Sequence, residues 1–85
     1  MPYRVFIEKK AAKVLEKINE PDYSRVKNAI LDLGRNPRPL GFIKLKGREG
    51  YRIREGDYRI IYDIIDQVLR VNVVIIGHRK DIYRN

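Results

Sequence analysis

The sequence predicts a two-layer α+β domain, in which two N-terminal helices pack on one face of a largely antiparallel four-stranded sheet. Three observations predict it. The chain has 85 residues, which suits one domain spanning residues 1–85. Apolar residues recur at helical spacing between residues 9 and 34, and they alternate with polar ones between residues 51 and 77. One short strand precedes the helices, so the expected order is β-α-α-β-β-β.

The first half of the chain is expected to supply one strand and both helices. Residues 3–8, YRVFIE, alternate as a strand does, and residues 9–19, KKAAKVLEKIN, follow as a helix. Pro21 cannot continue this helix, but it suits the start of a second one, from about Asp22 to Gly34. Gly34 is the expected C-terminal cap. The two apolar helix faces consist of Ala11, Val14, Leu15 and Ile18, and of Tyr23, Val26, Ala29, Ile30 and Leu33.

The second half is expected to form a three-stranded meander. Residues 35–42, RNPRPLGF, contain two prolines and a glycine and should form a loop. The basic residues 43–50, IKLKGREG, are expected to be partly extended and exposed. The strands are Tyr51–Arg54, Asp57 to about Ile65, and about Val68 to Gly77, joined by turns at Glu55-Gly56 and Asp66-Gln67.

Two-residue turns fix the expected register of this meander. The expected pairs are Arg54 with Asp57, Arg52 with Arg59, and Asp63 with Arg70. One face then carries the core: Tyr51, Ile53, Tyr58, Ile60, Tyr62, Ile64, Leu69, Val71, Val73 and Ile75. The other face is open, and it carries the charged residues together with the apolar Ile61, Val74 and Ile76.

Arg52 and Arg59 form a like-charged pair in this register. Like charges directly opposite each other destabilise a sheet. We interpret the pair as a site for an external phosphate, because that group supplies the missing negative charge. The alternative is that both side chains are long, flexible and screened by salt, so that their repulsion costs little.

The charge balance also indicates an anionic partner. Lys and Arg total 19 and Asp and Glu total 11, which gives a net charge of +8 and favours nucleic acid or an acidic protein. No cysteine and a single histidine exclude disulfides, thiolate metal sites and histidine clusters, so we expect no metal and no cofactor. The N-terminus does not resemble a signal peptide, and no apolar run is long enough for a bilayer. We therefore expect a cytoplasmic protein with no membrane partner.

Taken together and in order, three motifs carry a resemblance to a known family. They are KLKG before the meander, YRIR…DYRIIY across its first hairpin, and GHRKDIY at its end. Over essentially the whole chain, the sequence resembles the RelE branch of the RelE/ParE toxin superfamily. The resemblance implies a RelE-like fold and the toxin of a type II toxin–antitoxin system. It also implies a metal-independent, ribosome-dependent endoribonuclease that cuts mRNA in the A site through attack by the ribose 2′-OH.

The resemblance implies the site residues and the partners. Arg52, Arg54, Arg59, Arg79 and Tyr83 stand where the family has its catalytic residues. Tyr83 is a candidate general base or a platform for stacking, and the acid and base stay open. The expected RNA- or ribosome-binding residues are Lys44, Lys46, Arg48, His78 and Lys80. The expected partners are a cognate RelB-like antitoxin, mRNA on the ribosome, and ribosomal RNA.

The sequence departs from the family pattern in two respects. Some relatives have lysines at the positions of Arg52 and Arg54, and an arginine cannot serve as a general base because it stays protonated. The tail is also short. Alternative hypotheses are a ParE-like inhibitor of DNA gyrase, a non-catalytic basic module that binds nucleic acid, and a toxin paralogue without activity that binds an antitoxin.

Overall fold

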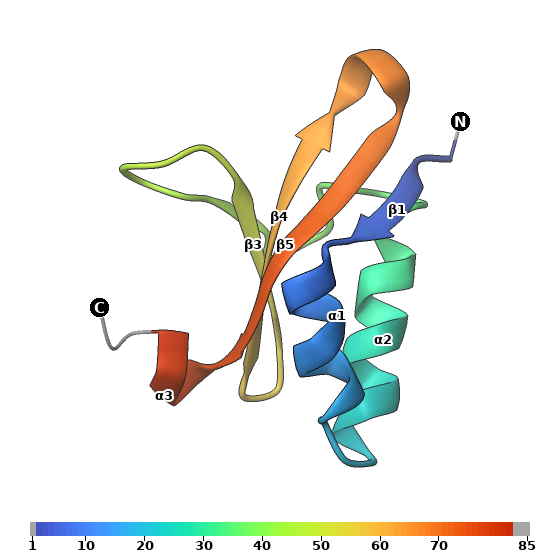
Figure 1. The fold of residues 1–85 in the computed structure, drawn as a ribbon. Coiled ribbons are helices and arrows are strands. Elements are labelled where there is room, and N and C mark those ends of the chain that lie inside the picture. Colours follow the sequence, from blue (N-terminus) through green and yellow to red (C-terminus); the bar gives the residue numbers. More distant parts are fainter. Residues whose placement is uncertain (1, 83–85) are drawn as a thin grey trace.

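The computed structural model describes residues 2–82 and confirms the α+β architecture (Figure 1). The elements are β1 (Arg4–Ile7), α1 (Lys9–Glu16), α2 (Asp22–Asp32), β2 (Ile43–Lys44), β3 (Tyr51–Glu55), β4 (Tyr58–Ile65), the 3-10 turn η1 (Asp66–Val68), β5 (Arg70–His78) and α3 (Arg79–Ile82). Within the described residues, the sheet has five strands in the order β1-β5-β4-β3-β2, instead of the expected four. The additional strand is β2, which comes from the basic segment before the meander.

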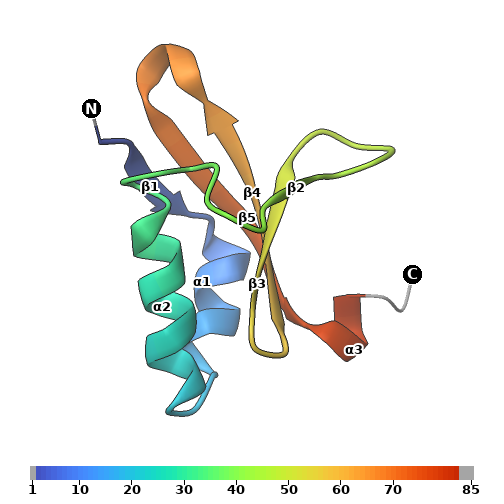
Figure 2. The ribbon, with the colours of Figure 1, turned by 180° about the vertical axis from the view of Figure 1, so that it is seen from behind.

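Helices α1 and α2 lie side by side on one face of the sheet, as both views show (Figures 1 and 2). β1 runs parallel to β5, and the other strand pairs are antiparallel. The core between the two layers contains Ala11, Leu15, Ile18, Val26, Ile30, Leu33, Ile53, Ile60, Tyr62, Val71, Val73 and Ile76. Among residues 2–82, no helix is long and apolar enough to cross a membrane.

Gly34 serves a different purpose from the expected cap. α2 ends at Asp32, and the φ of Gly34 is not positive. A Cβ at this position would lie 3.0 Å from the carbonyl oxygen of Tyr3 and 3.2 Å from a methyl group of Val5. The Tyr3 amide donates a hydrogen bond of 2.7 Å to the Gly34 carbonyl. The glycine therefore lets β1 approach the end of α2 closely.

The first hairpin turns one residue later than expected. Its turn consists of Gly56, with a φ of 58°, and Asp57. The expected register is therefore wrong by two residues: the observed pairs are Arg54 with Arg59, Arg52 with Ile61, Ile53 with Ile60 and Glu55 with Tyr58. A shift of two residues keeps every side chain on its expected face, because strands have a period of two.

The second hairpin differs from the expected one in its register and, after a bulge, in the faces on which its side chains lie. η1 and Leu69, which has a φ of 51°, replace the expected two-residue turn. Asp63 consequently lies opposite Asn72, and its expected pairing with Arg70 is wrong. A bulge then adds one residue, Val74, to β5.

The bulge exchanges the faces of the residues that follow it. Ile76 pairs with Ile60 and is 3% exposed in the core, although it was expected on the open face. Ile75 pairs with Ile61 and lies on the open face, although it was expected in the core. An extra residue changes which side of the strand each later side chain occupies, and the sequence contains no glycine or proline at this position to indicate it.

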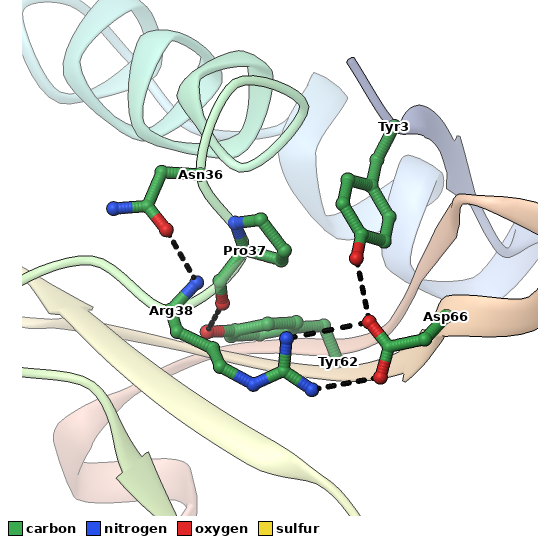
Figure 3. A network of polar contacts seen from close by, with 6 residues as sticks. All are labelled: Tyr3, Asn36, Pro37, Arg38, Tyr62 and Asp66. Atoms are coloured by element: carbon green, nitrogen blue, oxygen red, sulfur yellow. Dashed lines mark hydrogen bonds and ion pairs between the residues drawn. The ribbon is translucent and has the colours of Figure 1, made fainter. Parts of the chain in front are cut away.

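A polar network joins β1, the loop after α2 and the β4–β5 turn (Figure 3). Asp66 accepts two hydrogen bonds from the guanidinium of Arg38, at 3.3 and 2.9 Å, and one from the hydroxyl of Tyr3. Beneath it, the hydroxyl of Tyr62 donates a buried hydrogen bond of 2.7 Å to the carbonyl of Pro37. The hydrogen bonds from Arg38 and Tyr3 lower the pKa of Asp66, and burial raises the pKa of Tyr62 to about 12.

Candidate functional site

Arg54 and Arg59 lie directly opposite each other on the open face of the β3–β4 hairpin. The side chain of Arg54 is exposed, whereas Arg59 is only 5% exposed. Among residues 2–80, whose burial the structure describes, Arg59 is the one charged residue that is buried. On β5 its neighbour is Gly77, which has no side chain to fill the space beside it. The fold therefore buries the side chain of Arg59 and places an exposed arginine opposite it on the neighbouring strand.

Arg52 lies on the same face, two residues before Arg54 on β3. Its pairing partner on β4 is Ile61, and on β2 it is Ile43. The expected Arg52–Arg59 pair is therefore wrong, because the turn is shifted. The like-charged pair exists nonetheless, and Arg54 is the member opposite Arg59. The three arginines occupy one face of two adjacent strands, since residues two apart on a strand point the same way.

Arg79 begins α3 and is held at the turn of the same hairpin. Its backbone amide donates a hydrogen bond of 2.7 Å to the carbonyl of Asp57. Its Nε atom lies 3.8 Å from a carboxylate oxygen of Asp57, and its side chain is 58% exposed. Asp57, the expected partner of Arg54, therefore contacts Arg79 instead. This contact brings Arg79 to the end of the hairpin where Arg54 and Arg59 lie.

His78 lies on the opposite face of the sheet from Arg52, Arg54 and Arg59. It pairs with Tyr58, and their rings meet edge to face with centroids 5.5 Å apart on the helix side. Its Nε2 lies 3.9 Å from Asp57, and its Nδ1 accepts a hydrogen bond of 3.3 Å from the amide of Lys80. The fold thus separates His78 from Arg52, Arg54 and Arg59, whereas His78 and Arg79 both approach the carboxylate of Asp57. Lys80 is exposed beside Arg79.

The other basic residues predicted to bind RNA lie in and before the β2–β3 loop, which projects from the sheet (Figure 1). Lys46 and Arg48 are exposed there, and Arg48 donates a hydrogen bond of 3.3 Å to the carbonyl of Glu49. Lys44 pairs with Tyr51 and so points to the helix side. Tyr83, the predicted base or stacking residue, lies outside the described residues.

Sequence reasoning missed one feature of the open face. The guanidinium of Arg70 lies 3.9 Å from the centre of the Phe6 ring, and both side chains point away from the helices. The signal was present in the alternation of residues 3–8, which turns Phe6 away from Val5 and Ile7. It could not be used without knowing that β1 pairs with β5.

The arrangement is suited to binding a phosphate and to stabilising its negative charge. A guanidinium presents its donors in a planar fork that matches phosphate oxygens. Several of them around one phosphate stabilise negative charge that develops during a reaction. Arginine does not transfer protons at ordinary pH, so these residues position and stabilise but do not act as acid or base.

Comparisons with solved structures agree with this fold. A chain of the archaeal RelE–RelB complex from Pyrococcus horikoshii matches with a TM-score of 0.83 and 31% identity, and the match covers 100% of both chains. A chain of the RelBE2 toxin–antitoxin complex from Mycobacterium tuberculosis matches with a TM-score of 0.80 and 29% identity, over 93% of this chain and 100% of that one. The isolated RelE toxin of E. coli matches with a TM-score of 0.77 and 25% identity, over 89% and 83%.

Fold and sequence together define a toxin of the RelE/ParE superfamily. The sequence profile described as the ParE toxin of the type II toxin–antitoxin system parDE matches residues 5–83, and the chain belongs to this family. A search by sequence among curated proteins gives no match.

Proposed function

We propose that this toxin is a ribosome-dependent endoribonuclease that cleaves mRNA in the A site and so arrests translation. The observation that carries the proposal is the opposed pair Arg54–Arg59, with Arg59 buried on the open face and Arg79 held at the same end of the hairpin. A face that confines a cation and surrounds it with further cations suits an RNA phosphodiester.

In this mechanism the ribose 2′-OH attacks the adjacent phosphorus, and the bond to the 5′-oxygen breaks. The products are a 2′,3′-cyclic phosphate and a 5′-OH, so the proton of the 2′-OH must be removed and the 5′-oxygen must gain one. Arg59 and Arg79 stabilise the additional charge of the phosphorane, and Arg52 and Arg54 hold the RNA backbone. Removing one such donor costs about 2.7–4 kcal/mol of transition-state stabilisation. Guanidinium groups supply this charge, so the mechanism needs no metal.

The proton transfers require groups other than these arginines. Arginine cannot remove the proton, and His78 faces the helix side. We assign the remaining candidate role, as base or as stacking platform, to Tyr83. The ribosome and the RNA supply the rest, and alignment of the 2′-OH for in-line attack carries much of the rate.

The proposed partners follow from charge and from the relatives. Structures that match this chain contain RelB antitoxins, so we propose a RelB-like antitoxin of acidic or amphipathic character that acts in the cytoplasm. We expect it to bind the open face, where Ile61 and its pairing partner Ile75 lie. The exposed Lys46, Arg48 and Lys80, together with Lys44, are assigned to ribosomal RNA or mRNA.

A second candidate function has support from the family match, whose description names ParE. On the same fold, this protein would inhibit DNA gyrase without cutting RNA. One experiment separates the two: the purified protein is incubated with ribosomes carrying a defined mRNA, and primer extension locates any break. We expect a cut in the A-site codon that depends on the ribosome. Intact mRNA together with inhibition of gyrase supercoiling would reverse the assignment.

A further inference from the structure

We propose a second RNA-contact patch on the open face, formed by Arg4, Phe6 and Arg70 where β1 pairs with β5. This patch, which we call the β1 patch, contacts the phosphate backbone of RNA beyond the point of cleavage. The proposal rests on the proposed function, because RNA is taken as the ligand of this face.

The pairing of β1 with β5 brings two arginines together. Arg4 and Arg70 are parallel-strand partners, and both are exposed. Paired residues point to the same side of a sheet, and the next pair along the strands, Val5 and Val71, points into the core. Arg4 and Arg70 therefore repeat, on neighbouring strands, the like-charged arrangement of Arg54 and Arg59.

Arg70 is held in a defined orientation. Its guanidinium carbon lies 3.9 Å from the centre of the Phe6 ring, and its Nε donates a hydrogen bond of 2.8 Å to Asn72. Stacking and this hydrogen bond fix the plane of the fork, so less conformational freedom is lost when it meets a phosphate. Phe6 keeps 41% of its surface exposed, so part of its ring remains accessible to a ligand.

Carboxylates do not neutralise the patch. Among residues 2–82, neither Arg4 nor Arg70 forms a salt bridge. Asp66 faces the helix side, where it binds Arg38 and Tyr3. Asp63 shares the open face, but it lies opposite Asn72, near Gly50 of the β2–β3 loop. An external anion is thus the group that this pair of charges lacks.

The patch lies at the far end of the sheet from the proposed point of cleavage. Arg70 begins β5, and Gly77, the partner of Arg59, is near its end. Seven residues of strand separate them, which corresponds to roughly 23 Å. One strand of RNA several nucleotides long spans this distance, so both sites can be occupied together. RNA is favoured over an acidic peptide because a base can stack on the guanidinium plane of the exposed Arg70, which itself lies on the Phe6 ring.

The test is the salt dependence of RNA binding at equilibrium. Fluorescence anisotropy is measured with an unstructured 20-nucleotide oligouridylate between 50 and 200 mM KCl, for the wild type and for the double variant Arg4→Gln/Arg70→Gln. Each phosphate contact to a single strand contributes about 0.7 to the slope of log K against log salt, so we expect the slope to fall by about 1.4. The matched control is Lys10→Gln/Lys13→Gln, which removes the same charge from the exposed side of α1 and should leave the slope unchanged. Phe6→Leu should weaken binding by less than the double variant does.

Two further binding measurements with the double variant distinguish ribosomal RNA from mRNA as the ligand of the patch. Loss of binding by the double variant to ribosomes without mRNA assigns the patch to ribosomal RNA, and loss confined to the oligonucleotide and to programmed ribosomes assigns it to mRNA. The inference is overturned if the slope of the double variant equals that of the wild type, or if the wild type binds no RNA. It is also overturned if the double variant still binds RNA as the wild type does but no longer binds an acidic antitoxin. Failure of the patch and failure of the proposed function can be told apart. An unchanged slope in the double variant, with normal cleavage by the wild type, refutes the patch alone. A reduced slope in the double variant, with no cleavage by the wild type, refutes the nuclease function alone.

Discussion

Arg54 and Arg59 face each other across the hairpin of β3 and β4, and Arg59 is buried while Arg54 is exposed. Directly opposed like charges destabilise a sheet by a few tenths of a kcal/mol to about 1 kcal/mol. The arrangement therefore places two like charges on neighbouring strands at the position where we propose that an RNA phosphate binds. Stability and function should respond in opposite directions to changes at Arg54.

The first prediction concerns Arg54→Gln. We expect the free energy of unfolding to rise by about 0.2–1 kcal/mol, because the repulsion of Arg59 is removed, and cleavage of mRNA to fall. Urea denaturation measures the first effect and primer extension the second. Lys10→Gln, an exposed change on α1, is the control and should alter neither. A variant that is clearly less stable than the wild type would mean that Arg54 holds the hairpin together.

The second prediction concerns Tyr62→Phe. The variant leaves the carbonyl of Pro37 buried without its donor, so we expect a loss of about 1–3 kcal/mol in the free energy of unfolding. Denaturation at neutral pH measures it. Tyr23→Phe, at a half-buried position on α2, is the matched control and should have a smaller effect. Equal losses in the two variants would contradict the role given to the hydrogen bond.

The third prediction is the alkaline behaviour of the same tyrosine. Burial raises the pKa of Tyr62 to about 12, from about 10 in the unfolded chain. Its contribution is therefore fully present below pH 10 and is lost as pH rises from about 10 to 12. The free energy of unfolding of the wild type should fall more steeply across this range than that of Tyr62→Phe. Parallel pH profiles for the two proteins would exclude Tyr62 as the titrating group.

The fourth prediction concerns acid. Arg38 and Tyr3 lower the pKa of Asp66, so the stability it contributes is present above the ordinary pKa of an aspartate, near 4, and is lost as pH falls through the lowered value. Asp66→Asn should therefore unfold with a shallower dependence on pH below about 4 than the wild type. Thermal denaturation between pH 2 and 7 measures this. The idea is wrong if the acid limbs of the two curves coincide.

Much of this fold follows from periodicity alone. The helices, the meander and the face of nearly every meander residue before the bulge were predictable, because helix and strand periods survive small errors in turn position. The register of the first hairpin was not predictable, because Gly56 can occupy either position of a short turn and only packing selects one of them. The bulge at Val74 and the pairing of β1 with β5 depend on tertiary contacts, so the sequence does not indicate them.

In the candidate site, too, the faces on which the side chains lie were predictable, but their interaction partners were not. Arg52, Arg54 and Arg59 were expected on the open face, and they lie there because parity was preserved. Their partners were not predictable: Asp57 contacts Arg79 instead of Arg54, because the turn is shifted. The separation of His78 from Arg52, Arg54 and Arg59 follows from the bulge, which sets the parity at the end of β5.

The central claim is that the open-face arginines carry mRNA cleavage, and the most direct test is the cleavage rate of Arg79→Ala on programmed ribosomes. Arg79 is 58% exposed and its ion pair with Asp57 is long, so the variant should lose less than about 1 kcal/mol of stability. Arg59→Gln is measured beside it, with circular dichroism to establish that both variants fold, and Lys10→Gln serves as the control. We predict that each arginine variant cuts at least about 100-fold more slowly than the wild type while the control is unchanged. Folded Arg79→Ala and Arg59→Gln proteins that cut at the wild-type rate would contradict the account.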